Sequence, residues 1–368
     1  MLGRIALVIS SMLLTLLVLE LGARLMHGAE GAWKWQNLVL LERDPMAGTR
    51  QGRFVYDAQL GFISTPNFNS TDVNYDARGY RMGPLLPEDV ANKRPVVALG
   101  DSYTQGDELT DTETWPAQLQ GILHRPVVNA GVTGYGIDQT ILRAERAVAE
   151  LKPAAIVIGF IPDDLRRAEM RRVWGTEKPY FTLEGHELKL HDVPVPPSPS
   201  PRDTLDWAQW IFGYSVAVDT FLRHKGWQYE WAVDHERVLP RGEGERIACA
   251  LMQRLAGLAR DAQAPALIVA QYDPYSWQDA EFPKEQRRIA AGLLKCATDA
   301  GLATVDTFAA FDKAIAAMGL HSIYLKHHPS PIGARLIAEQ VAAGLAPLLD
   351  RQSDQGDGHS DVHRDRQQ

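Results

Sequence analysis

The chain has 368 residues, of which 45% are hydrophobic and 23% are charged, so it can fold as one large domain or two smaller ones and is not disordered throughout. Its formal net charge is −8 at pH 7 and it contains no run of Lys or Arg, which excludes nucleic acid as an expected partner. The two cysteines, Cys249 and Cys296, lie in segments of helical character and lack the close spacing of a zinc ribbon. We predict that they are small core residues rather than a disulfide or a metal site.

An uncharged stretch, "IALVISSMLLTLLVL" (5–19), follows Arg4 near the start of the chain. It is shorter than the ~20 apolar residues of a usual membrane span, but Glu20 and Arg24 can lie at the interface with their stems along the helix. No convincing cleavage site follows, so we predict an uncleaved anchor over 1–25, with a cleaved signal peptide as the alternative. In both cases the positive charge on the N-terminal side predicts export, and thus a periplasmic domain at the inner membrane.

Residues 26–94 are rich in Gly, Asn, Asp and aromatic residues without long apolar periodicity, which predicts a lead-in region with short strands. Apolar strands and amphipathic helices then alternate from residue 95 to residue 350. The predicted strands are 95–100, 126–131, 154–160, 266–272 and 303–308, and the predicted helices are 114–124, 136–151, 244–262, 284–301 and 330–349. This alternation predicts an α/β domain whose parallel sheet is covered by helices on both faces.

The segment from about 175 to 243 interrupts this alternation, and we predict that it is an insertion. It contains "VPVPPSPSP", typical of a polyproline segment on the surface, and four tryptophans, Trp207, Trp210, Trp227 and Trp231. We expect the tryptophans to pack the insertion onto the main domain; a platform for sugar or lipid is the alternative. Residues 351–368 have almost no apolar side chains, which predicts a disordered tail.

Ser102 lies in "ALGDSYTQG" (98–106), directly after the first strand of the α/β domain. Ligands of an open parallel sheet bind at the carboxyl ends of its strands, so this serine is placed where a substrate would meet it. The stretch lacks the Gly and Lys pattern of a phosphate-binding loop and also the G-x-S-x-G nucleophile elbow. It therefore fits neither of those classes.

Three further loops follow predicted strands or open the last helix: "NAGVTGYGIDQ" (129–139), "GFIPDDLRR" (159–167) and "HHPSPIGARLIAE" (327–339). Together with the Gly-Asp-Ser loop, in this order, they resemble the SGNH or GDSL-like hydrolase family over about residues 96–345 outside the insertion. The resemblance implies a flavodoxin-like three-layer α/β/α fold. The lead-in, with "YDARGYR", is similar to the leader of membrane-anchored bacterial members.

By this resemblance, Ser102 would be the nucleophile and its backbone N–H one oxyanion donor, with the Gly134 N–H as the second donor. His328 would be the general base that takes the serine proton and returns it to the leaving alcohol. Asp101 would shape the serine loop by accepting backbone hydrogen bonds. We expect no metal site and no cofactor in this chain, and we expect His327 to be a surface residue.

Two positions depart from the family pattern. Asp163 stands where the family has Asn as a third oxyanion donor, and a carboxylate can donate only if burial keeps it protonated. Leu325 stands where the family has the Asp that orients the histidine, a loss that costs roughly 10⁴-fold in another serine hydrolase. A backbone carbonyl or a remote acid, for which Asp163 is a candidate, would then have to orient His328.

The sequence therefore predicts a membrane-anchored serine esterase or O-acyltransferase for small acyl groups, such as acetyl, on envelope carbohydrate. Lipid esters are the nearest competing substrates, and a polysaccharide-modifying protein of the envelope is an expected partner. The two departures motivate an alternative from another class: a catalytically impaired domain that binds an acylated glycan or an envelope partner.

Overall fold

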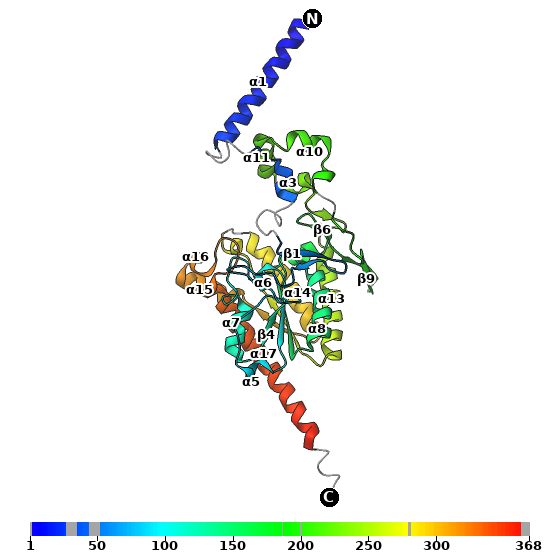
Figure 1. Cartoon of the computed structure of the whole chain (residues 1–368), viewed down its shortest axis with the longest axis vertical. Coiled ribbons are helices and arrows are strands. Elements are labelled where there is room, and N and C mark those ends of the chain that lie inside the picture. Colours follow the sequence, from blue (N-terminus) through cyan, green and yellow to red (C-terminus); the bar gives the residue numbers. More distant parts are fainter. Residues whose placement is uncertain are drawn as a thin grey trace. The chain divides into compact units, whose positions relative to one another are not determined.

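The computed structural model describes residues 2–26, 35–43, 52–185, 187–198, 201–278 and 281–361. The chain divides into two compact units (Figure 1). The first consists of Met1–Gln51, Arg171–Glu177 and Pro196–Arg237, and the second of Gly52–Met170, Lys178–Val195 and Val238–Gln368.

The second unit is built on a parallel five-stranded sheet with the order β12-β11-β5-β3-β4. Its strands are β3 (Val96–Leu99), β4 (Val127–Asn129), β5 (Ala155–Phe160), β11 (Ala266–Ala270) and β12 (Ala303–Asp306). Numbered among themselves they run 2-1-3-4-5, the flavodoxin-like order, so the predicted fold class is confirmed. The order reverses at β3, and a crevice for ligands is expected there, at the carboxyl ends of β3 and its neighbours.

Alternating side chains of the strands face two separate cores, which makes the unit three-layered. Val97 and Ile156 belong to one core, whereas Val96 and Ala155 belong to the other, as the two-residue period of a strand requires. The first core is covered by α8 (Ile137–Leu151), α13 (Glu243–Asp261) and α14 (Phe282–Asp299). The second is covered by α7 (Trp115–Leu123), α15 (Phe308–Met318), α16 (Leu320–Ile323) and α17 (Pro331–Asp361).

Two antiparallel hairpins complete the second unit. The first, β1 (Phe54–Asp57) with β2 (Gly61–Ser64), lies in the lead-in region, which also holds the short helix α5 (Glu88–Ala91). The second, β8 (Tyr180–Glu184) with β9 (Glu187–His191), comes from the segment predicted to be an insertion.

The first unit contains the N-terminal helix α1 (Leu2–Met26). Its other elements are α3 (Leu38–Arg43), the sheet β10-β6-β7 (Glu236–Arg237, Met170–Val173, Thr176–Glu177), η1 (Pro201–Thr204), α10 (Trp207–Phe212), α11 (Val216–Lys225) and α12 (Gln228–Ala232). By length and composition, α1 and the start of α17 are the two described helices that could cross a membrane. The apolar face of α17 packs in the core of the second unit, whereas α1 has no buried residue in its apolar window.

Three tryptophans of the first unit have largely exposed side chains, and the packing of the insertion onto the main domain stays a prediction. Trp207, Trp210 and Trp227 are 73%, 61% and 50% exposed. The physical reason is local: the six-residue helix α10 buries only Gln209, so its aromatic side chains point outward.

Cys249 and Cys296 form a disulfide between α13 and α14, so the prediction of two unpaired core thiols is wrong. They are 47 residues apart in sequence, but their Cα atoms are 5.2 Å apart because the two helices pack side by side. Closing a loop of this length contributes about 4 kcal/mol by the chain-entropy relation. Disulfides persist mainly in oxidising compartments.

The predicted disordered tail (351–368) is also corrected in part. Helix α17 continues to Asp361, because extending an existing helix needs no new nucleation. Residues 362–368 lie outside the described residues.

Candidate active site

Ser102 is the first residue of the short helix α6 (Ser102–Gln105), which begins just after β3. Asp101 caps this helix: its carboxylate accepts a hydrogen bond from the Tyr103 N–H at 2.9 Å. Gly100 makes the turn from strand to helix, and a Cβ there would lie 2.3 Å from Thr104 Oγ1 and 2.5 Å from the Gly159 carbonyl oxygen. Only glycine therefore allows this close approach of the serine loop to β5.

His328 lies in the loop between α16 and α17, and its Nε2 is 2.9 Å from Ser102 Oγ. The fold thus joins two side chains that are 226 positions apart in sequence. Tyr103 supports the loop from the serine side: its hydroxyl donates to the His327 carbonyl at 2.8 Å, and its ring lies 5.2 Å from the His328 ring. A backbone hydrogen bond from Leu325 N–H to the His328 carbonyl, 2.9 Å long, closes the loop.

Gly134 lies in the glycine loop that follows β4, with a φ of +82°, which favours glycine. This loop packs directly on α6, since a Cβ on Gly131 would be 2.5 Å from the Gln105 nitrogen. Among the described residues, neither the Ser102 N–H nor the Gly134 N–H donates to an acceptor. Both predicted oxyanion donors are therefore available to a ligand.

Asp163 opens helix α9 (Asp163–Arg167) after β5, and the contacts described for its carboxylate are with two arginines. Its Oδ1 is 2.5 Å from Arg166 Nε, and its Oδ2 is 3.0 Å from Arg167 Nη2. These guanidinium groups balance the negative charge of Asp163. A carboxylate paired with two arginines accepts hydrogen bonds and does not donate them.

Arg167 also neutralises two buried carboxylates next to the serine loop. Its Nη1 lies 2.8 Å from Asp164 Oδ1 and 3.4 Å from Asp101 Oδ2. Burial raises the pKa of Asp101, which Arg167 opposes, and burial followed by the charge of Asp101 raises the pKa of Asp164. This cluster holds the loops after β3 and β5 together beneath Ser102.

Glu108, which the sequence analysis missed, lies on the other side of the His328 ring. Its Oε2 is 3.5 Å from His328 Nδ1 and accepts a 3.4 Å hydrogen bond from the His327 N–H. The contact with His328 lowers the pKa of Glu108 to about 2, so the carboxylate is ionised at neutral pH. The family motif has its acid three residues before the histidine, so it gives no reason to consider Glu108. The one hint in the sequence is that Leu325 stands where that acid is expected, which implies that another acid could replace it.

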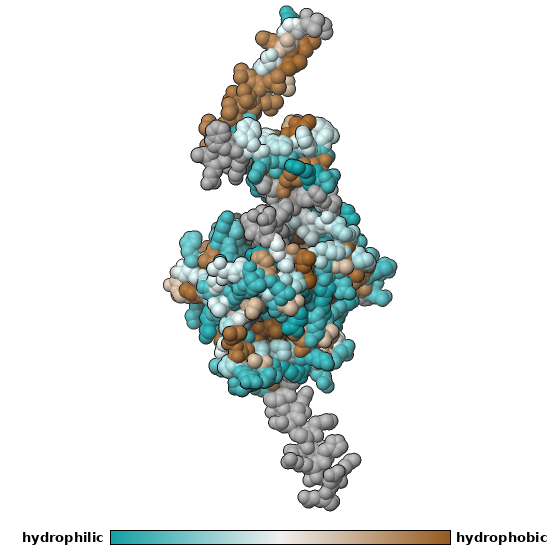
Figure 2. Space-filling view, viewed as in Figure 1, coloured by the Kyte–Doolittle hydropathy of each residue, from teal (hydrophilic) through white to brown (hydrophobic). Residues whose placement is uncertain are grey.

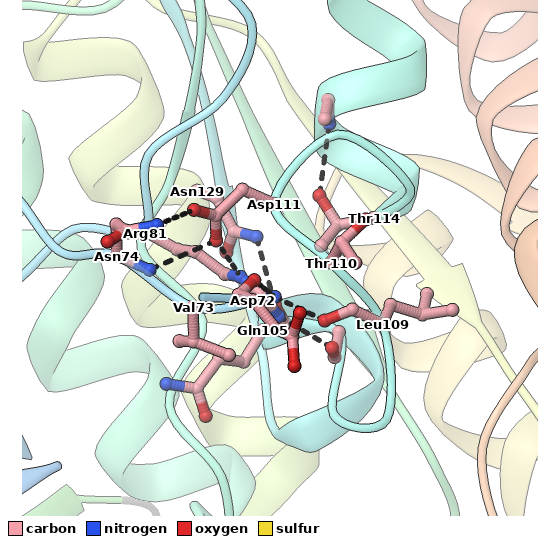
Figure 3. Close-up of polar contacts among 12 residues, drawn as sticks. Asp72, Val73, Asn74, Arg81, Gln105, Leu109, Thr110, Asp111, Thr114 and Asn129 are labelled. Carbon is pink, nitrogen blue, oxygen red and sulfur yellow. Dashed lines mark hydrogen bonds and ion pairs between the residues drawn. The ribbon is translucent and has the colours of Figure 1, made fainter. Parts of the chain in front are cut away.

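Arg81 holds the turn that follows α6 (Figure 3). Its guanidinium donates to the carbonyl groups of Gln105, Gly106 and Leu109, and its Nε is 2.9 Å from Asp111 Oδ1. The side chain of Arg81 is fully buried. Through these bonds the lead-in region fixes the path of the chain from Ser102 to residue 111.

No metal site accompanies these residues in the described part of the chain, which holds no cluster of three or more His, Cys, Asp or Glu side chains able to bind an ion. His327 is exposed, and its Nδ1 is 3.4 Å from the Tyr275 hydroxyl.

A serine and a histidine within hydrogen-bond distance, at the carboxyl edge of a doubly wound sheet, place the chain among the serine hydrolases. A family model, the GDSL-like lipase/acylhydrolase family, matches residues 98–336, and the chain belongs to that family. It is thus an ester-hydrolysing enzyme, as the resemblance in the sequence predicted.

Solved structures with similar folds include two hydrolases. An alpha/beta hydrolase enzyme from the metagenome of Lake Arreo, Spain, is 15% identical, and the match covers 69% of this chain and 95% of the other, with a TM-score of 0.43. An acetylxylan esterase from Geobacillus stearothermophilus is 14% identical, with 70% and 96% covered and a TM-score of 0.41. No curated protein matches the sequence at a significant level.

Proposed function

We propose that this protein is an exported enzyme, held at the inner membrane by α1, that removes or transfers a small acyl group on an oxygen ester of envelope carbohydrate. The observation that carries the proposal is the 2.9 Å separation of Ser102 Oγ and His328 Nε2. A base at this distance can take the hydroxyl proton as the oxygen attacks.

The proposed reaction follows from this pair and the two N–H groups beside it. His328 takes the proton of Ser102 while Oγ forms a bond to the ester carbonyl carbon. The N–H groups of Ser102 and Gly134 donate to the oxyanion of the tetrahedral intermediate. Protonated His328 gives its proton to the leaving sugar oxygen, and the acyl group stays on Ser102. Water, or a second hydroxyl in a transfer reaction, then loses a proton to His328 and takes the acyl group, and His328 returns that proton to Ser102 Oγ as its bond to the acyl carbon breaks.

A small acyl group fits the surroundings of the nucleophile. Ser102 is only 7% exposed, and the glycine loop packs on α6 without room for a Cβ at Gly131. Tyr103 closes the other side against the ring of His328. A nucleophile with so little exposed surface favours a small acyl group such as acetyl over a long acyl chain.

The contacts of α1 support its retention as an anchor. Glu20 accepts hydrogen bonds from the Val216 N–H at 3.0 Å, the Ala217 N–H at 3.1 Å and the Ser215 hydroxyl at 2.7 Å. Arg24 donates to the Tyr214 carbonyl at 2.9 Å. Cleavage of α1 would leave the first N–H groups of α11 without this carboxylate.

Exposed aromatic side chains lie in the same unit as α1, on α10, α11 and the residues between them and α12. They are Trp207, Trp210, Phe212, Phe221 and Trp227, and Figure 2 shows hydrophobic atoms gathered on α1 and over α10. Amphipathic aromatic rings are enriched at the level of lipid head groups, which supports a membrane beside this unit.

Retention of α1 predicts that peptides from residues 5–26 remain in the mature protein. We expect mass spectrometry of the full chain, expressed in a Gram-negative host and isolated from carbonate-washed membranes, to detect them. A soluble periplasmic product whose first residue lies beyond Met26 would show instead that α1 is a cleaved signal peptide.

The substrate is tested with the purified full chain in detergent and esters that differ in acyl length. We expect kcat/KM for p-nitrophenyl acetate to exceed that for p-nitrophenyl laurate by about tenfold or more, since each extra methylene must fit beside a serine that is only 7% exposed. Acetate release from an acetylated polysaccharide and acetyl transfer to an added oligosaccharide separate hydrolysis from transfer, with Ser102→Ala as the blank.

A preference for the laurate ester would contradict the assignment of a small acyl group and favour lipid esters. Binding of the acetylated polysaccharide without turnover of any ester would favour the catalytically impaired domain instead.

A further inference from the structure

We propose that Glu108 orients His328 from the loop of the nucleophile itself, in place of the acid that Leu325 does not supply. Glu108 is thus a positioning residue: it acts on the substrate only through the imidazole. This inference rests on the proposed function, because it assigns a role within the same Ser102–His328 site.

The two nitrogens of His328 face two different residues. Nε2 lies 2.9 Å from Ser102 Oγ, and Nδ1 lies 3.5 Å from Glu108 Oε2. Nδ1 is buried and makes no hydrogen bond to any other residue that the structure describes. A modest shortening of the contact with Glu108 would complete a carboxylate–imidazole–hydroxyl chain, and such contacts often tighten when substrate binds.

The backbone at Glu108 adds a second, independent observation. Its φ is +67°, a conformation in which a residue other than glycine or asparagine is strained by about 1 kcal/mol. Glycine would adopt this conformation without strain, so the glutamate side chain is present at a cost in backbone energy. His328 is also the only ion-pair partner of Glu108 among the described residues. The contacts described for this carboxylate are therefore with the loop of His328: the imidazole and the His327 N–H.

The turn that carries Glu108 is held rigidly on both sides. Arg81 binds the carbonyl oxygens of Gly106 and Leu109, the residues that flank the pair 107–108 (Figure 3). The Leu109 side chain is buried in the core, and Glu108 Oε2 also accepts the His327 N–H. The carboxylate is thereby kept beside the imidazole.

Two other acids near the site, Asp101 and Asp163, are engaged elsewhere. Asp101 accepts the Tyr103 N–H and lies against Arg167, and Asp163 is paired with Arg166 and Arg167. Lys326 is a cation and has no acceptor for the Nδ1–H of His328, and the Nδ1 of His327 faces the Tyr275 hydroxyl at 3.4 Å instead.

The test compares Glu108→Gln with Glu108→Gly and with a transplanted acid, Glu108→Gln combined with Leu325→Asp. We expect Glu108→Gln to lower kcat for p-nitrophenyl acetate about 10²-fold with KM changed less than about threefold, a milder loss than that of a fully buried triad acid. Glu108→Gly should lose as much activity while its Tm stays equal or rises. The variant with the transplanted acid should have a kcat at least about tenfold higher than that of Glu108→Gln alone.

Glu113→Gln is the matched control, because Glu113 lies on the same loop and bonds to Thr110 rather than to His328. It should leave kcat within about twofold. Wild-type kcat in Glu108→Gln, or a loss that follows a lowered Tm and is not recovered by Leu325→Asp, would overturn the proposal.

The outcome for Glu108 can be separated from the outcome for the proposed function. If the wild-type chain turned over none of the esters, the proposed function would fail, but the rate at which a serine-reactive phosphonate labels Ser102 would still report on its activation. We expect labelling to slow about 10²-fold in Glu108→Gln, and equal labelling rates would overturn the role of Glu108.

Discussion

Ser102→Ala should lower kcat/KM for p-nitrophenyl acetate by at least about 10³-fold, and His328→Ala should lower it by a similar factor. Without Oγ no acyl-enzyme can form, and without Nε2 at 2.9 Å the hydroxyl has no base to take its proton. The two groups act as one unit, so the double variant should be no worse than either single variant. The measurement is steady-state hydrolysis by the full chain in detergent.

Both variants should fold, because each removes a few atoms from a site that the surrounding loops hold in place. Unchanged circular dichroism and Tm would establish this. Additive losses in the double variant, or a Ser102→Ala protein as active as the wild type, would show that another group performs the chemistry.

Arg81→Met should lower the free energy of unfolding by about 3–5 kcal/mol, the range found when one partner of a buried ion pair is removed. Methionine keeps much of the volume but leaves the Asp111 carboxylate and four carbonyl oxygens without their guanidinium donor, those of Asp72, Gln105, Gly106 and Leu109. A buried acceptor without a donor has lost its hydrogen bonds to water and gained none in the protein, which lowers the stability of the folded state. Urea unfolding followed by circular dichroism measures the loss.

Arg78→Met is the matched control, since its guanidinium lies 3.4 Å from Asp76 on a side chain that is 50% exposed. Such surface pairs contribute about 0–1 kcal/mol. Equal effects of the two substitutions would show that burial of the Arg81 network (Figure 3) is not what stabilises the turn after α6.

Local patterns in the sequence were sufficient to predict the alternating strands and helices of an α/β domain, whereas the flavodoxin-like fold was implied by the family resemblance. The strand at Val96–Leu99 and the helix at Ile137–Leu151 were predicted because buried strands are continuous apolar runs and amphipathic helices repeat every 3.6 residues. Each signal lies within one segment and needs no distant partner.

Predictions that depended on distant contacts succeeded only where a family motif supplied them. The motif order suggested that Ser102 and His328 meet, and the structure places them in contact, while their catalytic roles remain proposals for kinetics to test. No motif linked Cys249 to Cys296, and no periodicity shows which faces of two helices touch.

The sequence by itself therefore determined the alternating strands and helices, the apolar N-terminal helix and the loops that carry Ser102 and His328. Only the tertiary structure decided which acid lies beside His328, because Glu108 reaches the imidazole through a left-handed turn whose path Arg81 sets from the lead-in region. The physical reason is that residue pattern encodes local conformation and burial, whereas the pairing of two side chains depends on where whole loops are packed.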